Sequence, residues 1–475
     1  MPIGVERSSL PAASSMPRLA LRLLSPLAPV LALALAGVPT ASAAGPPSVA
    51  DSVVVRFAPG TSATARARAA HAAGTPVPRH IVGATWLTRP RRAARAGDVI
   101  ARLQRRREVV SATRQYAARI AVTPNDTGVA AAAGPPSGWQ QQQWDFVGPF
   151  GINVLGAWDL AAQAGAPGGG LVRVAVVDTG VAYADRGRMK RSPDIAQARI
   201  LRGYDFVAND PYPNDANGHG TFVAATIAAS ANNGYGMVGV AYGAEILPVR
   251  VLDASGGAGS ARIAQGVRFA VDHGARVINA SIELFDPMAF PPRALSITTA
   301  PEIREAIRYA HKHGVIVVAA SGNLAQSDVP GRRLAGSIIY VGGTTEHGCL
   351  GDYSNFGPGL DLVAPGGGAD APLAGDPNCH PELPPGRNIA QVTFRRSSPG
   401  RFVVPGDYRG TSMAAPHVTG VVALLLGART LGATPTPEAV EARLKATAHD
   451  LGTPGPDSHY GAGLVDATAA LAAPR

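Results

Sequence analysis

Four short, almost wholly apolar runs constrain the fold most strongly. They lie at residues 174–177, 277–280, 315–320 and 338–341. Each run has the length of a strand, and its continuous apolar character is typical of strands buried on both faces of a sheet. Segments with helical character lie between the runs, at residues 221–230, 261–273 and 300–313. This alternation predicts an α/β protein with three layers, in which helices cover both faces of a mostly parallel sheet.

Polar side chains stand where two of these runs end. Asp178 follows the first run directly, and Asn323 follows the third run after a Ser-Gly pair. Active residues of parallel α/β sheets gather at the carboxyl ends of the strands, so both residues are candidates for a site. Each also has an ordinary structural explanation, because Asp often caps a strand end and Asn often follows Gly in a turn.

A histidine and a serine complete the constellation. His219 lies between two glycines, directly before an apolar helical segment. Ser412 precedes an almost wholly apolar run over residues 413–426, whose Pro416 falls in the first turn, where proline is tolerated. A serine at a helix start is usually only a cap. At that position, however, its backbone N–H is also free to bind an oxyanion, and the four residues together supply nucleophile, base, orienting carboxylate and oxyanion donor.

The segments around these residues resemble the signature motifs of the subtilase family of serine peptidases. They read Asp178-Thr-Gly, His219-Gly-Thr, Ser321-Gly-Asn323 and Gly410-Thr-Ser412-Met-Ala-Ala-Pro, in the chain order Asp, His, Ser that subtilisin has. The resemblance covers residues 144–473. It implies a secreted, monomeric serine endopeptidase, made as a self-processed zymogen, that hydrolyses protein or peptide substrates through an acyl-enzyme intermediate and needs no cofactor for this chemistry.

The resemblance also implies where a substrate binds. In the family an extended peptide pairs with two backbone edges, which supply affinity through main-chain hydrogen bonds. The first edge is expected at Gly256 and Gly257, and the second at Ser281 and Ile282. Ala320 and Gly322 are expected to form the wall of the pocket that binds the residue before the cut.

Glu283 departs from the family pattern, which usually has Gly at this position. A carboxylate beside the cleft would favour basic substrates and attract an arginine-rich propeptide. The alternative is a solvated side chain without influence, because exposed ion pairs contribute only about 0 to 1 kcal/mol.

Two segments resemble the family's calcium loop. One contains Asp194 and the other contains Asn233, and their side-chain oxygens would supply ligands to a structural Ca²⁺ ion. The alternative is a tight glycine-rich turn without metal.

The first 143 residues divide into three segments. Residues 1–44 are typical of a secretory signal, with Arg18 and Arg22 before an apolar run over 23–38 and a small-residue Ala-Ser-Ala pattern at 41–43. Residues 45–123 predict a basic α+β propeptide that inhibits the catalytic domain of residues 144–475. Residues 124–143 are rich in Pro, Ala and Gln, which is the composition of a linker and processing region.

Charge is concentrated in the predicted propeptide. Residues 51–120 hold fourteen arginines and three acidic residues, whereas the net charge of the whole chain is +10. The basic segment lacks the interleaved aromatic residues of strand-binding surfaces, so a nucleic-acid partner is not expected. No stretch after the signal reaches the about 20 apolar residues that a membrane anchor needs.

The cysteine count suggests a disulfide. Cys349 and Cys379 are the two cysteines of a chain with a predicted export signal, and oxidising compartments favour their pairing. Two free buried thiols are the alternative.

Two other functions stay open from the residues alone. Asp-Thr-Gly is also the active tripeptide of aspartic peptidases and occurs at Asp126 and Asp178, but Asp126 has no apolar strand before it and the chain shows no two equivalent lobes. A secreted binding protein on an inactive protease scaffold is the second alternative. The presence of all four catalytic residues favours an enzyme.

Overall fold

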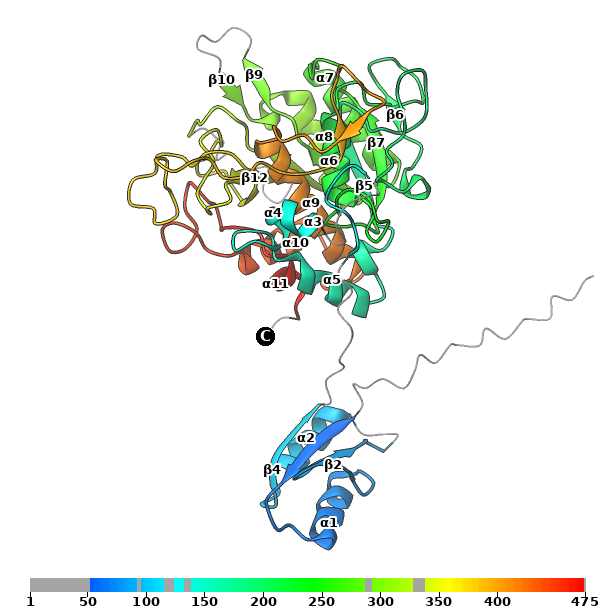
Figure 1. The fold of residues 1–475 in the computed structure, drawn as a ribbon, viewed down its shortest axis with the longest axis vertical. Helices are drawn as coiled ribbons and strands as arrows, with labels where there is room; N and C mark the ends of the chain where they lie inside the picture. The colour runs from blue at the N-terminus through cyan, green and yellow to red at the C-terminus, as the bar shows by residue number, and fades with distance from the viewer. Residues whose placement is uncertain are drawn as a thin grey trace, which may run out of the picture. The chain divides into compact units, whose positions relative to one another are not determined.

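The computed structural model describes residues 52–91, 95–114, 124–131, 138–286, 293–327 and 338–473 (Figure 1). The chain divides into two compact units, Met1–Ile120 and Ala121–Arg475, which are treated separately below. The predicted signal segment lies outside the described residues. Within the described residues, no helix has both the length and the apolar character to cross a bilayer.

Unit 1 is a small α+β domain with an antiparallel sheet of order β2-β3-β1-β4. Val53, Val55 and Phe57 alternate inward along β1 and pack with Val99 and Leu103 of α2. The elements in chain order are β1 Val53–Phe57, α1 Ala63–Ala73, β2 Arg79–Val82, β3 Thr85–Thr88, α2 Ala96–Gln104 and β4 Val109–Arg114. The sequence analysis missed α1, because its alternating Ala and Arg give no apolar stripe.

Unit 2 contains a parallel sheet of seven strands in the order β13-β12-β11-β8-β5-β7-β6. The strands are β5 Arg173–Asp178, β6 Tyr204–Asp205, β7 Glu245–Arg250, β8 Val277–Ala280, β11 Ile316–Ala320, β12 Ile339–Thr344 and β13 Leu362–Pro365. The main helices are α5 Val154–Gln163, α6 His219–Ala228, α7 Ser260–Asp272, α8 Pro301–Lys312 and α9 Thr411–Gly427.

The two faces of β5 show the three layers directly. Val174 and Val176 belong to one buried cluster, which includes α6 and α9, whereas Ala175 and Val177 belong to another, which includes α7 and α8. Helix α9, orange in Figure 1, runs through the interior of unit 2 and contacts β11 and β12. The three-layer α/β/α prediction is therefore confirmed.

The four apolar runs correspond to β5, β8, β11 and β12, while β6, β7 and β13 were missed. Strand β7 begins at Glu245, ends at Arg250 and contains Pro248, so it does not form an apolar run. Pro248 lies opposite Val176 of β5, whereas β6 pairs only with Val249 and Arg250, so residue 248 has no strand partner in β6.

Shorter elements complete unit 2. They are α3 Trp139–Gln142, α4 Trp144–Val147, β9 Leu284–Asp286, β10 Arg293–Leu295, β14 Thr393–Phe394, β15 Phe402–Val403, α10 Pro437–Thr447 and α11 Ala467–Leu471. Cys349 and Cys379 form a disulfide with Cα atoms 4.8 Å apart, which confirms the predicted pairing.

The described parts of residues 124–143 are packed into unit 2, unlike an exposed linker. Asp126 is buried, and its carboxylate accepts hydrogen bonds from the backbone N–H groups of Asn232 (2.9 Å) and Asn233 (3.2 Å). Trp139 is also fully buried, and its indole N–H donates to the carbonyl of Pro124 at 3.0 Å. The Pro, Ala and Gln content suggested a linker because composition does not reveal these long-range contacts.

Candidate active site

A cleft of about 850 Å³ lies at the carboxyl ends of the central strands of unit 2. It brings together eight residues that the sequence analysis selected from five separate segments. These are His219, Gly256, Gly257, Ser281, Ile282, Glu283, Asn323 and Ser412.

Asp178 and His219 form a close pair at one wall of the cleft. Asp178 ends β5 and is fully buried, and its Oδ1 lies 2.8 Å from Nδ1 of His219, whose side chain is 25 % exposed. An ionised carboxylate can only accept, so Nδ1 carries the proton and Nε2 is left as the basic nitrogen. Burial lowers the pKa of His219, but the charge of Asp178, its hydrogen bond and the charge of Asp215 outweigh burial and raise this pKa above its usual value.

Asp215 holds the start of α6 and was missed from the sequence. Its buried carboxylate accepts hydrogen bonds from Thr179 Oγ1 (2.9 Å), from Gly218 N (3.0 Å) and from both the backbone and the hydroxyl of Thr221 (2.9 and 2.7 Å). These bonds fix the Asp178 and His219 segments to each other. An Asp four residues before a helix-starting His was the available signal.

Ser412 stands in the first turn of α9. Helix α9 begins after Gly410, whose φ of 134° favours glycine and where an added Cβ would lie 3.0 Å from Asn323 Oδ1. The Ser412 hydroxyl donates to the Ser281 carbonyl at 3.4 Å, so it is directed to Ser281 rather than to His219. Catalytic hydrogen bonds are often loose before substrate binds. Among the described residues, no partner receives the backbone N–H of Ser412.

Asn323 is held in one orientation by Thr411, a residue that the sequence analysis did not select. Its Oδ1 accepts hydrogen bonds from the backbone N–H of Thr411 at 2.8 Å and from the Thr411 hydroxyl at 3.1 Å. Because a backbone N–H can only donate, the atom facing it must be the amide oxygen. The amide N–H₂ group therefore faces away from Thr411 and donates a hydrogen bond to the Glu283 carboxylate. An amide N–H₂ group has two N–H donors, so one is left to act as an oxyanion donor.

The two predicted substrate edges differ in their availability. Ser281 lies beside the nucleophile, since its hydroxyl donates to the Ser412 carbonyl at 2.9 Å. Gly256 and Gly257 line the cleft, but their N–H groups donate to the backbone (3.0 Å) and the carboxylate (3.1 Å) of Asp253. The Gly257 carbonyl also accepts the Asp253 N–H at 2.9 Å, so among the described contacts the Gly256 carbonyl is the backbone group of this pair that is left for a substrate.

Ala320 and Gly322 do not line the cleft. Both are buried, and an added Cβ at Gly322 would lie 2.6 Å from Oε1 of Glu283. Glu283 covers the position at which Gly322 was expected to wall a pocket. Composition could not show this, because the direction of the Glu283 side chain depends on its contact with Asn323.

Asp194 and Asn233 lie together but form no open cation shell. Asp194 accepts hydrogen bonds from Asn233 Nδ2 (2.9 Å) and Met237 N (3.0 Å), and burial raises its pKa to about 8. N–H donors converge here instead of the oxygen ligands that Ca²⁺ requires. Among the described residues, no group of three or more His, Cys, Asp or Glu side chains could hold a metal ion. The arrangement does not fit calcium.

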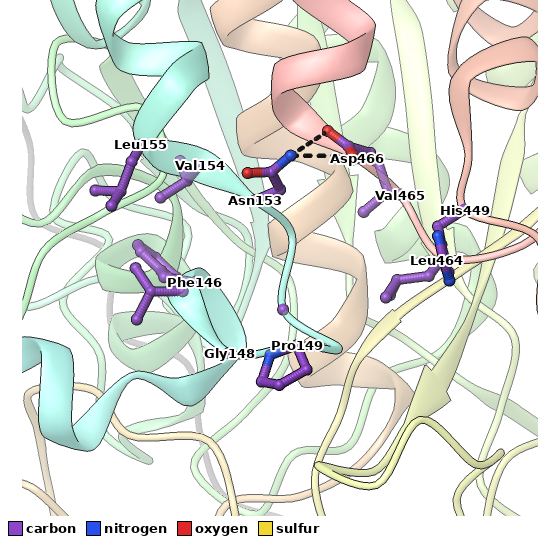
Figure 2. A pocket seen from close by; sticks show the side chains of 12 residues that line it. Phe146, Gly148, Pro149, Asn153, Val154, Leu155, His449, Leu464, Val465 and Asp466 are labelled. Atoms are coloured by element: carbon purple, nitrogen blue, oxygen red, sulfur yellow. Dashed lines mark hydrogen bonds between the residues drawn. The ribbon is translucent and has the colours of Figure 1, made fainter. Parts of the chain in front are cut away.

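A second cavity, of about 280 Å³, is shown in Figure 2. Asn153 Nδ2 donates to both carboxylate oxygens of Asp466 at 3.1 Å. Figure 2 shows His449 and Leu464 on one side of this pair, and Phe146 and Leu155 on the other. Asp466 also caps α11. This pocket ties the segment before α5 to the C-terminal segment, and it contains no residue of the constellation around Ser412.

A buried carboxylate on an imidazole, a serine at a helix start and an anchored amide in one cleft of an α/β sheet define a serine hydrolase. Residues 169–463 match the model of the subtilase family. The chain is 35 % identical over 324 residues to alkaline elastase YaB of Bacillus sp. (strain YaB), covering 68 % of this chain and 70 % of that protein. It is equally similar to Subtilisin Savinase of Lederbergia lenta, covering 98 % of that relative.

A solved structure gives the same result. A protease from Pseudoalteromonas arctica PAMC 21717 matches with a TM-score of 0.55 and 30 % identity, over 74 % of this chain and 99 % of the other. The chain therefore belongs to the subtilase family and is a serine-type endopeptidase. Neither an aspartic peptidase nor an inactive scaffold is favoured. Its chemistry needs no cofactor.

Proposed function

We propose that Ser412 is the nucleophile, His219 the general base and Asp178 the residue that orients His219. In this mechanism Nε2 of His219 takes the hydroxyl proton as Ser412 attacks the scissile carbonyl, and later returns it to the leaving amine. Asp178 stabilises the imidazolium that forms. The observation that carries the proposal is the 2.8 Å contact between Asp178 and the Nδ1 atom of His219, at a cleft that also contains Ser412.

We further propose that Asn323 and the backbone N–H of Ser412 bind the oxyanion. The anchoring of Asn323 Oδ1 on Thr411 supports this role, because it fixes the amide plane and leaves one N–H donor besides the one that binds Glu283. Water then hydrolyses the acyl-enzyme, with His219 acting again as base.

Labelling with a fluorophosphonate tests the nucleophile. We expect one covalent adduct on Ser412, identified by mass spectrometry of the peptide, and none on a Ser412→Ala variant with an unchanged circular dichroism spectrum. Labelling of a different serine, with retained peptidase activity in the Ser412→Ala variant, would refute the assignment.

We propose that unit 1 is an inhibitory propeptide that the enzyme removes itself, and that the protein is secreted. The basic charge of unit 1 and the Glu283 carboxylate in the cleft support an electrostatic attraction. Asp126 and its buried neighbours belong to unit 2, so the cut is expected before Pro124. Sequencing of the mature N-terminus tests its position.

Self-processing is tested separately. A Ser412→Ala full-length chain should remain uncut when purified alone and should be cut when wild-type enzyme is added. Normal maturation of the isolated variant would show that another protease does the cutting.

A further inference from the structure

The cleft contains one carboxylate that the proposed mechanism does not use. Among the described residues that line the cleft, His219 and Glu283 alone carry ionisable side chains. His219 has a carboxylate partner in Asp178. Among the described residues, no cation contributes to the environment of the Glu283 carboxylate. Burial and hydrogen bonds from Asn323 are the influences that shift its pKa.

Hydrogen bonding fixes the Glu283 side chain beside the reacting centre. Its Oε1 accepts the backbone N–H of Asn323 at 2.8 Å, and it covers Gly322, where a Cβ would meet Oε1 at 2.6 Å. Glu283 therefore extends from the segment after β8 to the end of β11. Its carboxylate lies against the residue that we assign as oxyanion donor.

The half-buried position makes an unpaired charge costly. Burial raises the pKa of Glu283, and hydrogen bonds from the backbone and side chain of Asn323 only partly offset this effect. A cation that entered the cleft would stabilise the Glu283 carboxylate electrostatically, which the described protein groups do not do. Glu283 thus favours a positively charged group next to the scissile bond.

The position of Glu283 identifies which substrate residue carries that charge. Ser281 and Ile282 form the predicted edge for the substrate backbone, and Asn323 marks the position of the scissile carbonyl oxygen. A carboxylate between these two features faces the side chain of the residue that precedes the cut. We propose, on the basis of the proposed function, that Glu283 makes this endopeptidase prefer Arg or Lys directly before the scissile bond.

Two peptide substrates that differ only in charge test the proposal. One has Arg before a fluorogenic leaving group, and the other has citrulline, which is nearly isosteric with Arg but neutral. We expect wild-type kcat/KM to be about ten- to a hundred-fold higher for Arg, the scale of a hydrogen bond to a charged partner. Glu283→Gln keeps the acceptor for Asn323 and should remove this preference, mainly by lowering kcat/KM for Arg.

Glu302→Gln is the matched control, because it removes the same charge outside the cleft lining and should keep the full Arg preference. An equal kcat/KM for Arg and citrulline in the wild-type enzyme, or an unchanged ratio in Glu283→Gln, would overturn the proposal. If Glu283 only positioned Asn323, Glu283→Ala would lower kcat for both substrates alike. Failure of the proposed function would look different, with no hydrolysis of either substrate and no fluorophosphonate adduct on Ser412.

Discussion

Two aspartate–histidine pairs of unit 2 have the same contact distance and opposite surroundings, whereas a third described pair, His347 and Asp370, is longer at 3.0 Å. Asp178 Oδ1 lies 2.8 Å from Nδ1 of His219, and Asp145 Oδ2 lies 2.8 Å from Nε2 of His417. Each carboxylate also has one buried oxygen without a partner among the described residues. The catalytic potential of a pair therefore cannot be judged from the hydrogen bond alone.

The second nitrogen of each ring separates the two pairs. His417 is fully buried, its Nδ1 donates to the Met413 carbonyl at 2.8 Å, and its ring packs against Phe146. Both nitrogens of His417 are thus occupied. The His219 ring is 25 % exposed and keeps Nε2 on the side of the cleft. In the proposed mechanism the same chemical pair supplies a base in one place, and in the other it forms an internal crosslink between α4 and α9.

The largest contrast is expected for the two histidines. His219→Ala should lower kcat by about 10⁶-fold, the scale known for loss of the base of such a triad, with little change in melting temperature. His417→Asn should do the reverse and act on stability, because it leaves Asp145 buried and unpaired. Steady-state kinetics on the folded fraction and thermal melts check both. A comparable loss of kcat in folded His417→Asn would break the distinction.

The two aspartates provide the next contrast. Asp178→Asn should reduce kcat by about 10⁴-fold, because the amide favours the wrong tautomer of His219. Asp145→Asn should instead lower the free energy of unfolding by about 3–5 kcal/mol, the usual effect of breaking a buried pair. Urea unfolding of both variants is the measurement. Similar stability losses in both would show that the two pairs share one role.

A third contrast concerns two asparagines, Asn323 at the proposed oxyanion site and Asn153 outside the cleft. Asn323→Ala should lower turnover by about 10²- to 10³-fold with an unchanged KM, because the donor acts on the developing oxyanion. Asn153→Ala is the control, since Asn153 binds Asp466 and does not line the cleft. Full turnover in Asn323→Ala would remove this residue from the oxyanion site.

The sequence sufficed for the parts whose signal is local. Continuous apolar runs predicted four of the seven strands, and the positions after two of these runs suggested Asp178, which lies beside His219, and Asn323, which lines the cleft. The same pattern could not find β7, whose Glu245 and Arg250 ends lie at the boundary of the buried layer. Nor could it give α1, which lacks an apolar stripe.

Contacts between distant segments explain the remaining misses. Thr411 and Asp215 matter because of the partners that folding brings to them, which no local pattern reveals. Asp145 and His417 are 272 residues apart in the chain, and their pairing follows only from the position of α4 against α9. Asp126 was assigned to a linker for the same reason.

The acid side of the pH profile tests the environment of His219. Its pKa is raised because Asp178 and Asp215 outweigh the effect of burial. The base must be neutral, so kcat/KM should rise about tenfold per pH unit up to a midpoint above the usual value of about 6.5. Asp178→Asn should move this midpoint to lower pH, as it removes the main stabiliser of the imidazolium. An activity maximum in acid would contradict a histidine base.

The smallest effect is expected from metal removal. Among the described contacts, the buried carboxylates near the predicted calcium loop bind neither a histidine nor a cation, and they accept hydrogen bonds from backbone and amide N–H groups instead. Asp194 accepts from Asn233 and Met237, and Asp126 accepts from Asn232 and Asn233. A cation here would face these donors and would have to displace them. The melting temperature should therefore stay the same in EDTA and in added Ca²⁺, whereas Asp126→Ala should cost about 1–3 kcal/mol by leaving buried N–H groups unpaired. A fall in EDTA that Ca²⁺ reverses would show instead that the loop reorganises around an ion, and that its carboxylates serve as ligands.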